Sequence, residues 1–105
     1  MVLKQEVKMK IYIAGKITGD KKYKKKFAAA EKALCKIGHS VMNPAWLVEY
    51  KEFSWIDYMS VSGAMQKCCD AVLFLPDWKE SNGAMFEHKR ALKLGQRIFY
   101  SFNEL

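Results

Sequence analysis

The chain has 105 residues, which is enough for one compact domain spanning 1–105 and too few for two. Half of the residues are hydrophobic, yet no apolar stretch approaches the roughly 18 residues of a membrane span, so we expect a folded domain without a membrane partner. The net charge of +7 favours anionic partners, and three cysteines, two of them adjacent, indicate a reducing, cytoplasmic location.

The first half of the chain predicts two strands separated by a helix. Residues 9–14 (MKIYIA) form a short apolar run that ends at Gly15, which indicates a buried strand followed by a loop over 15–20. An apolar stripe with helical spacing then runs from Tyr23 to Ile37, with lysines on the solvated face and Gly38 as a stop signal. Residues 40–43 (SVMN) predict a second strand closed by Pro44, and 45–54 predict an ordered loop or short helix.

The second half repeats the alternation. Residues 55–67 predict a helix with apolar positions at Ile56, Met59, Gly63 and Met65, and 71–75 (AVLFL) predict a central strand buried on both faces. A loop over 77–82 leads to a helix from about 83 to 94, ended by Gly95, and 97–100 (RIFY) predict a last strand. This order predicts an α/β fold, a single-domain flavodoxin- or Rossmann-like three-layer sandwich with about four parallel strands and a core over about 8–100.

Ligands of such sheets bind beyond the carboxyl ends of the strands, which here places 15–19, 43–46 and 76–87 at the expected site. Glu87 shares a predicted helix face with Ala84, Ala91 and Leu94, the positions that should point into the sheet. Burial would raise its pKa, while the helix N-terminus and hydroxyl donors would favour the charged form, leaving a poorly hydrated but ionised carboxylate. Such a group is suited to attack an electrophilic carbon.

Two other arrangements of Glu87 remain open. It could form a salt bridge with Lys89, Arg90 or Arg97, or a rotated helix could turn it toward water. Ser81 fits the cap of this helix, either for capping alone or also for contact with a ligand, and Gly83 would let a ligand approach the backbone.

The loop Gly15-Lys16-Ile17-Thr18-Gly19 offers backbone N–H groups, a cation and a hydroxyl to an anion directly after a strand. It matches neither a Walker A nor a dinucleotide-binding sequence, so an ordinary turn is equally consistent with it. The aromatic side chains at or near predicted strand ends could stack on a base, although most of them could equally be core or interface residues: Tyr12, Trp46, Phe53 and Trp78.

Neither histidine has a second ligand at metal spacing, so we expect no metal and no cofactor. The lysine run over 21–26 is typical of a solvated helix face. It lacks interleaved aromatic residues and any known nucleic-acid motif, so nucleic acid is not the expected partner.

Taken together, several segments resemble the nucleoside 2-deoxyribosyltransferase superfamily, in particular its short phage and bacterial branch, over roughly 8–100. They are Tyr12 to Gly19 (YIAGKITG), Asn43-Pro44, Cys69 to Val72 (CDAV), Pro76 to Trp78 (PDW), and Ser81 to Ala84 (SNGA) followed by Glu87.

The resemblance implies that Glu87 attacks the anomeric carbon of a nucleoside, giving a glycosyl-enzyme that another base or water resolves. By the same resemblance Ser81 orients Glu87 or the sugar, Tyr12 lies near the ribose, and the loop 15–19 holds a 5′-phosphate, as in the related 2′-deoxynucleoside 5′-monophosphate N-hydrolases. Asn43, Pro44, Trp46, Trp78 and Gly83 complete the expected substrate site. A homo-oligomer is also implied.

The chain departs from this family at one position, because Ser62 stands where members usually carry a catalytic aspartate. Asp57, earlier on the same predicted helix, and Asp77 are candidates to replace it. We therefore expect an enzyme that cleaves or transfers an N-glycosidic bond of a nucleoside 5′-monophosphate-like substrate. The alternative is a non-catalytic nucleotide-binding module, a sensor or sponge.

Overall fold

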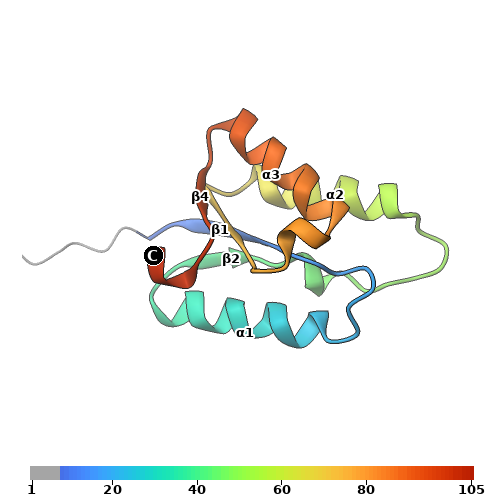
Figure 1. Ribbon diagram of the computed structural model, residues 1–105, viewed down its shortest axis with the longest axis horizontal. Coiled ribbons are helices and arrows are strands. Elements are labelled where there is room, and N and C mark those ends of the chain that lie inside the picture. Colours follow the sequence, from blue (N-terminus) through green and yellow to red (C-terminus); the bar gives the residue numbers. More distant parts are fainter. Residues whose placement is uncertain (1–7) are drawn as a thin grey trace, which may run out of the picture.

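The computed structural model describes residues 8–105, which form four strands and three α-helices in alternation (Figure 1). The strands are β1 (Lys10–Ala14), β2 (Ser40–Met42), β3 (Ala71–Phe74) and β4 (Arg97–Phe99). The helices are α1 (Tyr23–Lys36), α2 (Trp55–Lys67) and α3 (Asn82–Leu94). Three short 3₁₀ turns lie at Pro44–Trp46, Trp78–Glu80 and Phe102–Glu104.

All four strands are parallel, in the order β2-β1-β3-β4. The chain moves from β1 outward to β2, crosses back to β3, and moves outward in the other direction to β4. The topological switch point is therefore between β1 and β3. Helix α1 covers one face of the sheet, and α2 and α3 cover the other, which gives the predicted three-layer α/β sandwich (Figure 1).

The two faces of the sheet carry separate apolar clusters because successive residues of a strand point to opposite sides. Ile11 and Ile13 of β1 pack in the cluster that contains Phe27 and Leu34 of α1. Tyr12 lies in the cluster on the opposite face, beneath α3. The buried central strand is thereby confirmed, and so is the apolar stripe of α1 from Tyr23 to Leu34. Ile37, the last predicted position of the stripe, is exposed just beyond the end of the helix.

The ends of the last two helices follow from local signals in the sequence. Ser54 and Asp57 form a capping box, which explains why α2 begins at Trp55. Gly95 adopts the left-handed conformation with φ 70°, which ends α3. The segment predicted as a loop or short helix over 45–54 is one 3₁₀ turn followed by a loop.

Two details of the predicted faces of α2 and α3 are wrong. Ile56 is 69% exposed, and the buried side of α2 carries Ser62 and Gln66 beside the predicted Gly63. Leu94, expected on the sheet-facing stripe of α3, is 48% exposed at the last residue of the helix. Polar residues can occupy the buried side of α2 because they find hydrogen-bond partners there.

Within residues 8–105, none of the helices combines the length and the apolar character that crossing a membrane requires.

Candidate functional site

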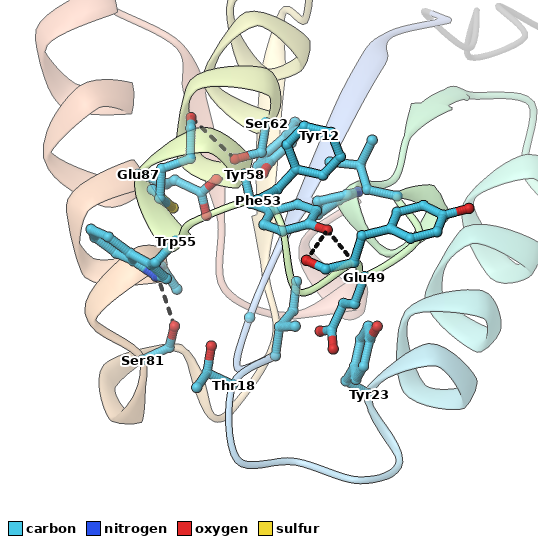
Figure 2. A pocket seen from close by; sticks show the side chains of 18 residues that line it. Tyr12, Thr18, Tyr23, Glu49, Phe53, Trp55, Tyr58, Ser62, Ser81 and Glu87 are labelled. Carbon is cyan, nitrogen blue, oxygen red and sulfur yellow. Dashed lines mark hydrogen bonds between the residues drawn. The ribbon is translucent and has the colours of Figure 1, made fainter.

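A cavity of about 340 Å³ opens at the carboxyl edge of the sheet, beside the switch point (Figure 2). Its walls come from β1 and the loop after it, from Tyr23 at the start of α1, from Pro44 after β2, from the segment 47–55, from α2, and from the first turns of α3. Segments far apart in the sequence thus meet where parallel sheets usually bind ligands.

Glu87 lies in the wall of this cavity and is only 5% exposed. It follows Ala84 by three residues and precedes Ala91 by four, so the three side chains share the buried stripe of α3. The phenolic hydroxyl of Tyr12, a fully buried residue of β1, donates a hydrogen bond to Glu87 Oε2. The prediction that Glu87 points into the sheet is confirmed, and among residues 8–105 it has no salt-bridge partner.

Burial raises the pKa of Glu87 from 4.5 to about 7, while hydrogen bonding from Tyr12, the charge of Arg90 and the Ser62 hydroxyl oppose that rise. The carboxylate was expected to be ionised, but a pKa of about 7 means that its protonated form is also populated near neutral pH. Burial and the Glu87 charge hold the pKa of Tyr12 well above its usual range, so its hydroxyl remains a donor.

A buried amide fixes the backbone of α3 at Glu87. Gln66 of α2 is fully buried, and its Nε2 donates to the Glu87 carbonyl oxygen at 2.9 Å. Arg90 Nη1 donates to Gln66 Oε1 at 3.3 Å, and Gln96 Nε2 donates to the Gln66 carbonyl oxygen at 2.8 Å. Sequence reasoning missed this network, although a glutamine inside the predicted α2 helix was a visible signal.

The loop after β1 contributes part of what was predicted for it. Gly15, Ile17 and Thr18 line the cavity, whereas Lys16 and Gly19 do not. The Lys16 backbone N–H donates to Asp77 Oδ1 at 3.0 Å, and its Nζ lies 3.7 Å from Glu80 Oε1. The Lys16 cation is therefore directed to Glu80 rather than to the cavity.

Lys26 ties this loop to the segment after β3. Its Nζ donates to the Lys16 carbonyl oxygen at 2.9 Å, to Asp20 Oδ2 at 2.6 Å, and to Asp77 Oδ2. The expectation that the lysine run is a solvated face is wrong for Lys26, although Lys21, Lys22, Lys24 and Lys25 are exposed.

Ser81 caps α3 by accepting a hydrogen bond from the Ala84 backbone N–H at 3.1 Å, and it also lines the cavity (Figure 2). Gly83 lines the cavity too. A Cβ at that position would lie 3.2 Å from Met59 Sδ, so Gly83 allows α3 to approach α2 closely. The predicted close approach of a ligand to Gly83 stays a prediction.

Several predicted site residues do not line the cavity. Asp57 is exposed, and its carboxylate accepts from the Ser54 backbone N–H at 2.7 Å in the capping box. Asn43 donates to Glu31 and caps the turn at Ala45. Trp46 Nε1 also donates to Glu31, and its exposed side chain lies outside the cavity wall.

Trp78 lies away from the cavity as well. Its ring stacks on His88 with centroids 4.4 Å apart, and His88 Nε2 lies 2.7 Å from the Tyr100 hydroxyl. The His88 ring also lies 5.0 Å from the ring of Phe74, a buried residue of β3, so His88 packs against the sheet beside Trp78.

The segment 47–58 supplies an aromatic wall that sequence reasoning mostly missed. Tyr50, Phe53, Trp55 and Tyr58 line the cavity together with Glu49. The Tyr58 hydroxyl accepts from the Tyr50 backbone N–H at 2.6 Å and donates to the Val48 carbonyl at 2.9 Å, so it pins the loop. The segment has no clean periodicity, and the sequence therefore indicated only Phe53 as an aromatic residue of the site.

Among the residues that the structure describes, the charged side chains in the cavity wall are both acidic, Glu49 and Glu87. They lie on different sides of the cavity (Figure 2). In the same described region, no cluster of three or more His, Cys, Asp or Glu side chains could hold a metal ion.

Residues 9–100 match the sequence model of a domain of unknown function, DUF4406. The chain belongs to this family. The match covers all four strands and all three α-helices. No curated protein matches the chain. Because the family description assigns no activity, the resemblance to the nucleoside 2-deoxyribosyltransferase superfamily stays a prediction.

Proposed function

We propose that the chain cleaves or transfers the N-glycosidic bond of a nucleoside 5′-monophosphate-like substrate, with Glu87 as the nucleophile. The observation that carries this proposal is the buried Glu87 carboxylate, held by the Tyr12 hydroxyl in the wall of a cavity at the switch point. A carboxylate that is poorly hydrated and fixed in place is suited to attack an anomeric carbon. The glycosyl-enzyme ester would then be resolved by water or by a second base.

Polar groups at one end of the cavity support a place for the sugar and its 5′ substituent. The hydroxyls of Thr18 and Ser81 line the wall there, close to the loop after β1 and the N-terminus of α3. Backbone N–H groups at a helix N-terminus favour an anion without any cationic side chain. A phosphate would therefore be held mainly by hydroxyl and backbone donors, since Lys16 is paired with Glu80.

A non-catalytic nucleotide-binding module is the second candidate, and Ser62 is the observation that favours it. Ser62 is buried beside Tyr12 and Glu87, where the resembling family usually carries an acid (Figure 2). A hydroxyl cannot protonate a departing base as a carboxylic acid does. If substrates of this chain need that proton, turnover would stop at binding.

The test is a chromatographic assay for free base released from a panel of ribo- and deoxyribonucleoside 5′-monophosphates, with and without an acceptor base. Wild type is compared with Glu87→Gln, which keeps the size of the side chain, and with Glu52→Gln, an exposed change in the loop before α2. Release by wild type and Glu52→Gln but not by Glu87→Gln supports the proposal.

No release from any substrate, together with ligand binding that survives in Glu87→Gln, supports the binding module instead. Release that persists in Glu87→Gln refutes the role of Glu87. An acceptor base that changes the product distinguishes transfer from hydrolysis.

We further propose that the chain self-associates, as the resemblance implies. Exposed apolar side chains on α2 and α3, among them Trp55, Ile56 and Phe86, support this. Sedimentation of the purified chain measures the assembly, and a monomer at all accessible concentrations would refute it.

A further inference from the structure

We propose that the base cleaved by this chain carries a positive charge, as a pyridinium or an N-alkylated purine does, so that it departs without a proton. This inference rests on the proposed function, because it names the substrate class of the same cavity. It is carried by three features of the wall: the position of Glu49, the open aromatic faces of the segment 47–58, and Ser62.

The sugar and the base of a substrate would lie at different ends of the cavity. The anomeric carbon must lie against Glu87, and the polar end at Thr18 and Ser81 would take the rest of the sugar. The base is then left the end where Glu49 and Tyr23 lie (Figure 2). A base bound there would meet a carboxylate and no cationic side chain of the described residues.

Glu49 lies beside Tyr23 at this end of the cavity. The two side chains lie next to each other (Figure 2), and burial followed by the Glu49 charge raises the pKa of Tyr23. Tyr23 therefore stays protonated and can donate to Glu49. An ionised carboxylate at this end only accepts hydrogen bonds and attracts a positive ring.

The aromatic side chains beside Glu49 suit the same kind of base. Tyr50 and Phe53 line the cavity with 57% and 55% of their surfaces exposed, so ring surface is open to a ligand. Phe53 packs edge-on against both Tyr50 and Tyr58, at centroid distances of 6.4 and 6.2 Å. A cationic ring stacked on such rings gains cation–π attraction in addition to stacking.

With a positively charged base, cleavage needs no acid in place of Ser62. Glu87 Oε forms a bond to C1′, the C1′–N bond breaks, and its electron pair stays on the ring nitrogen, which becomes neutral. No proton moves in this step. Water then adds its oxygen to C1′, Glu87 departs as a carboxylate, and the proton of that water passes to solvent. A neutral base would instead leave as an anion unless an acid protonated it.

The binding test compares two probes with the same sugar and phosphate. Nicotinamide mononucleotide carries a pyridinium ring, and its dihydro form carries an uncharged one. Affinities are measured by calorimetry in the Glu87→Gln background, which prevents turnover, with and without Glu49→Gln. The matched control is Glu52→Gln in the same background, which changes charge by the same amount outside the cavity wall.

We expect the pyridinium form to bind about tenfold tighter than the dihydro form, and Glu49→Gln to remove that preference while Glu52→Gln leaves it. Equal affinities, or tighter binding of the dihydro form, would overturn the inference.

A turnover assay distinguishes failure of this inference from failure of the proposed function on which it rests. Base release by wild type is measured for nicotinamide mononucleotide and for inosine 5′-monophosphate, each relative to its uncatalysed rate. A larger acceleration for the cationic substrate supports the inference, and an equal or larger one for the neutral substrate overturns it while leaving the proposed function standing. If neither base is released but the pyridinium preference is found, the function fails and the cation-binding site remains.

Discussion

Replacing Glu87 with glutamine should stabilise the fold at neutral and higher pH. Burial raises the pKa of Glu87 in the folded chain to about 7, compared with 4.5 for an exposed carboxyl. Between these two values the folded state binds more protons than the unfolded state, so this group makes the protein less stable as pH rises. At about 1.4 kcal/mol for each pH unit, the loss reaches about 3 kcal/mol once both states are ionised.

Glu87→Gln removes the titration and keeps an oxygen that accepts from Tyr12. We therefore expect the free energy of unfolding of Glu87→Gln to equal that of wild type near pH 4 and to exceed it by up to about 3 kcal/mol near pH 8. The measurement is a series of urea unfolding curves across that range. Subtracting the two proteins at each pH cancels every other titrating group that the substitution leaves unchanged.

Glu52→Gln serves as the control, because this exposed carboxyl is not buried on folding and its replacement should give a difference near zero at every pH. Our account of Glu87 would be refuted by a Glu87→Gln variant that is no more stable than wild type near pH 8. A stabilisation of the same size near pH 4 would also refute it, since it would not come from ionisation.

Three further changes probe the site and its supports. Tyr12→Phe removes the hydrogen bond that lowers the pKa of Glu87. A carbon-13 NMR titration of the Glu87 carboxyl should therefore give a pKa above about 7, and an unchanged pKa would contradict the role of the hydroxyl. Lys26→Met breaks the ties between the loops after β1 and β3 and should lower the free energy of unfolding by on the order of 1 kcal/mol, whereas Lys24→Met on the exposed face should not. Gly95→Ala places a side chain at φ 70° and should cost about 1 kcal/mol in thermal unfolding, and a loss near zero would mean that the end of α3 can relax.

The fold was largely predictable because each element carries a strong local signal. The apolar run at β3 and the helical stripe that includes Phe27 and Leu34 fixed the order and faces of the elements, and strand alternation implied the parallel sheet. The ends of the helices were equally visible, since Ser54 can cap α2 and Gly95 can end α3. The final 3₁₀ turn at Phe102–Glu104 was not predicted.

The position of Glu87 was predictable for a similar reason, because its spacing from Ala84 and Ala91 placed it on the buried stripe. The remaining walls of the cavity were not. Whether Trp46 or Tyr50 faces the cavity depends on the path of the loop, which the Tyr58 hydroxyl fixes through contacts eight and ten residues away. No periodic pattern in the sequence carries that information.

The ion pairs of two lysines were likewise not predictable from a local pattern in the sequence. Lys16 and Lys26 both looked like free cations in the sequence, yet Lys16 pairs with Glu80 and Lys26 with Asp77, besides its local partner Asp20. Asp77 and Glu80 lie after β3, and they become neighbours of the lysines only when β1 and β3 pair. The positive net charge of the chain therefore does not extend into the cavity wall, where the charged side chains among the described residues are acidic. Net charge predicted an anionic partner, whereas the wall itself favours a positive ring.

The contacts around Glu87 explain how the fold retains a buried carboxyl group whose ionisation lowers its stability. A buried carboxyl with a pKa of about 7 would relax toward water if α3 could shift. That shift would break the hydrogen bond from Gln66 to the Glu87 carbonyl oxygen and would separate Tyr12 from the carboxylate. Since both partners are fully buried, each loss would cost a buried hydrogen bond. Only the contact from Tyr12 depends on the carboxylate, whereas the contact from Gln66 reaches the backbone and holds α3 whatever residue stands at position 87. Under the function that we propose, this backbone contact keeps the nucleophile in place although its ionisation lowers stability.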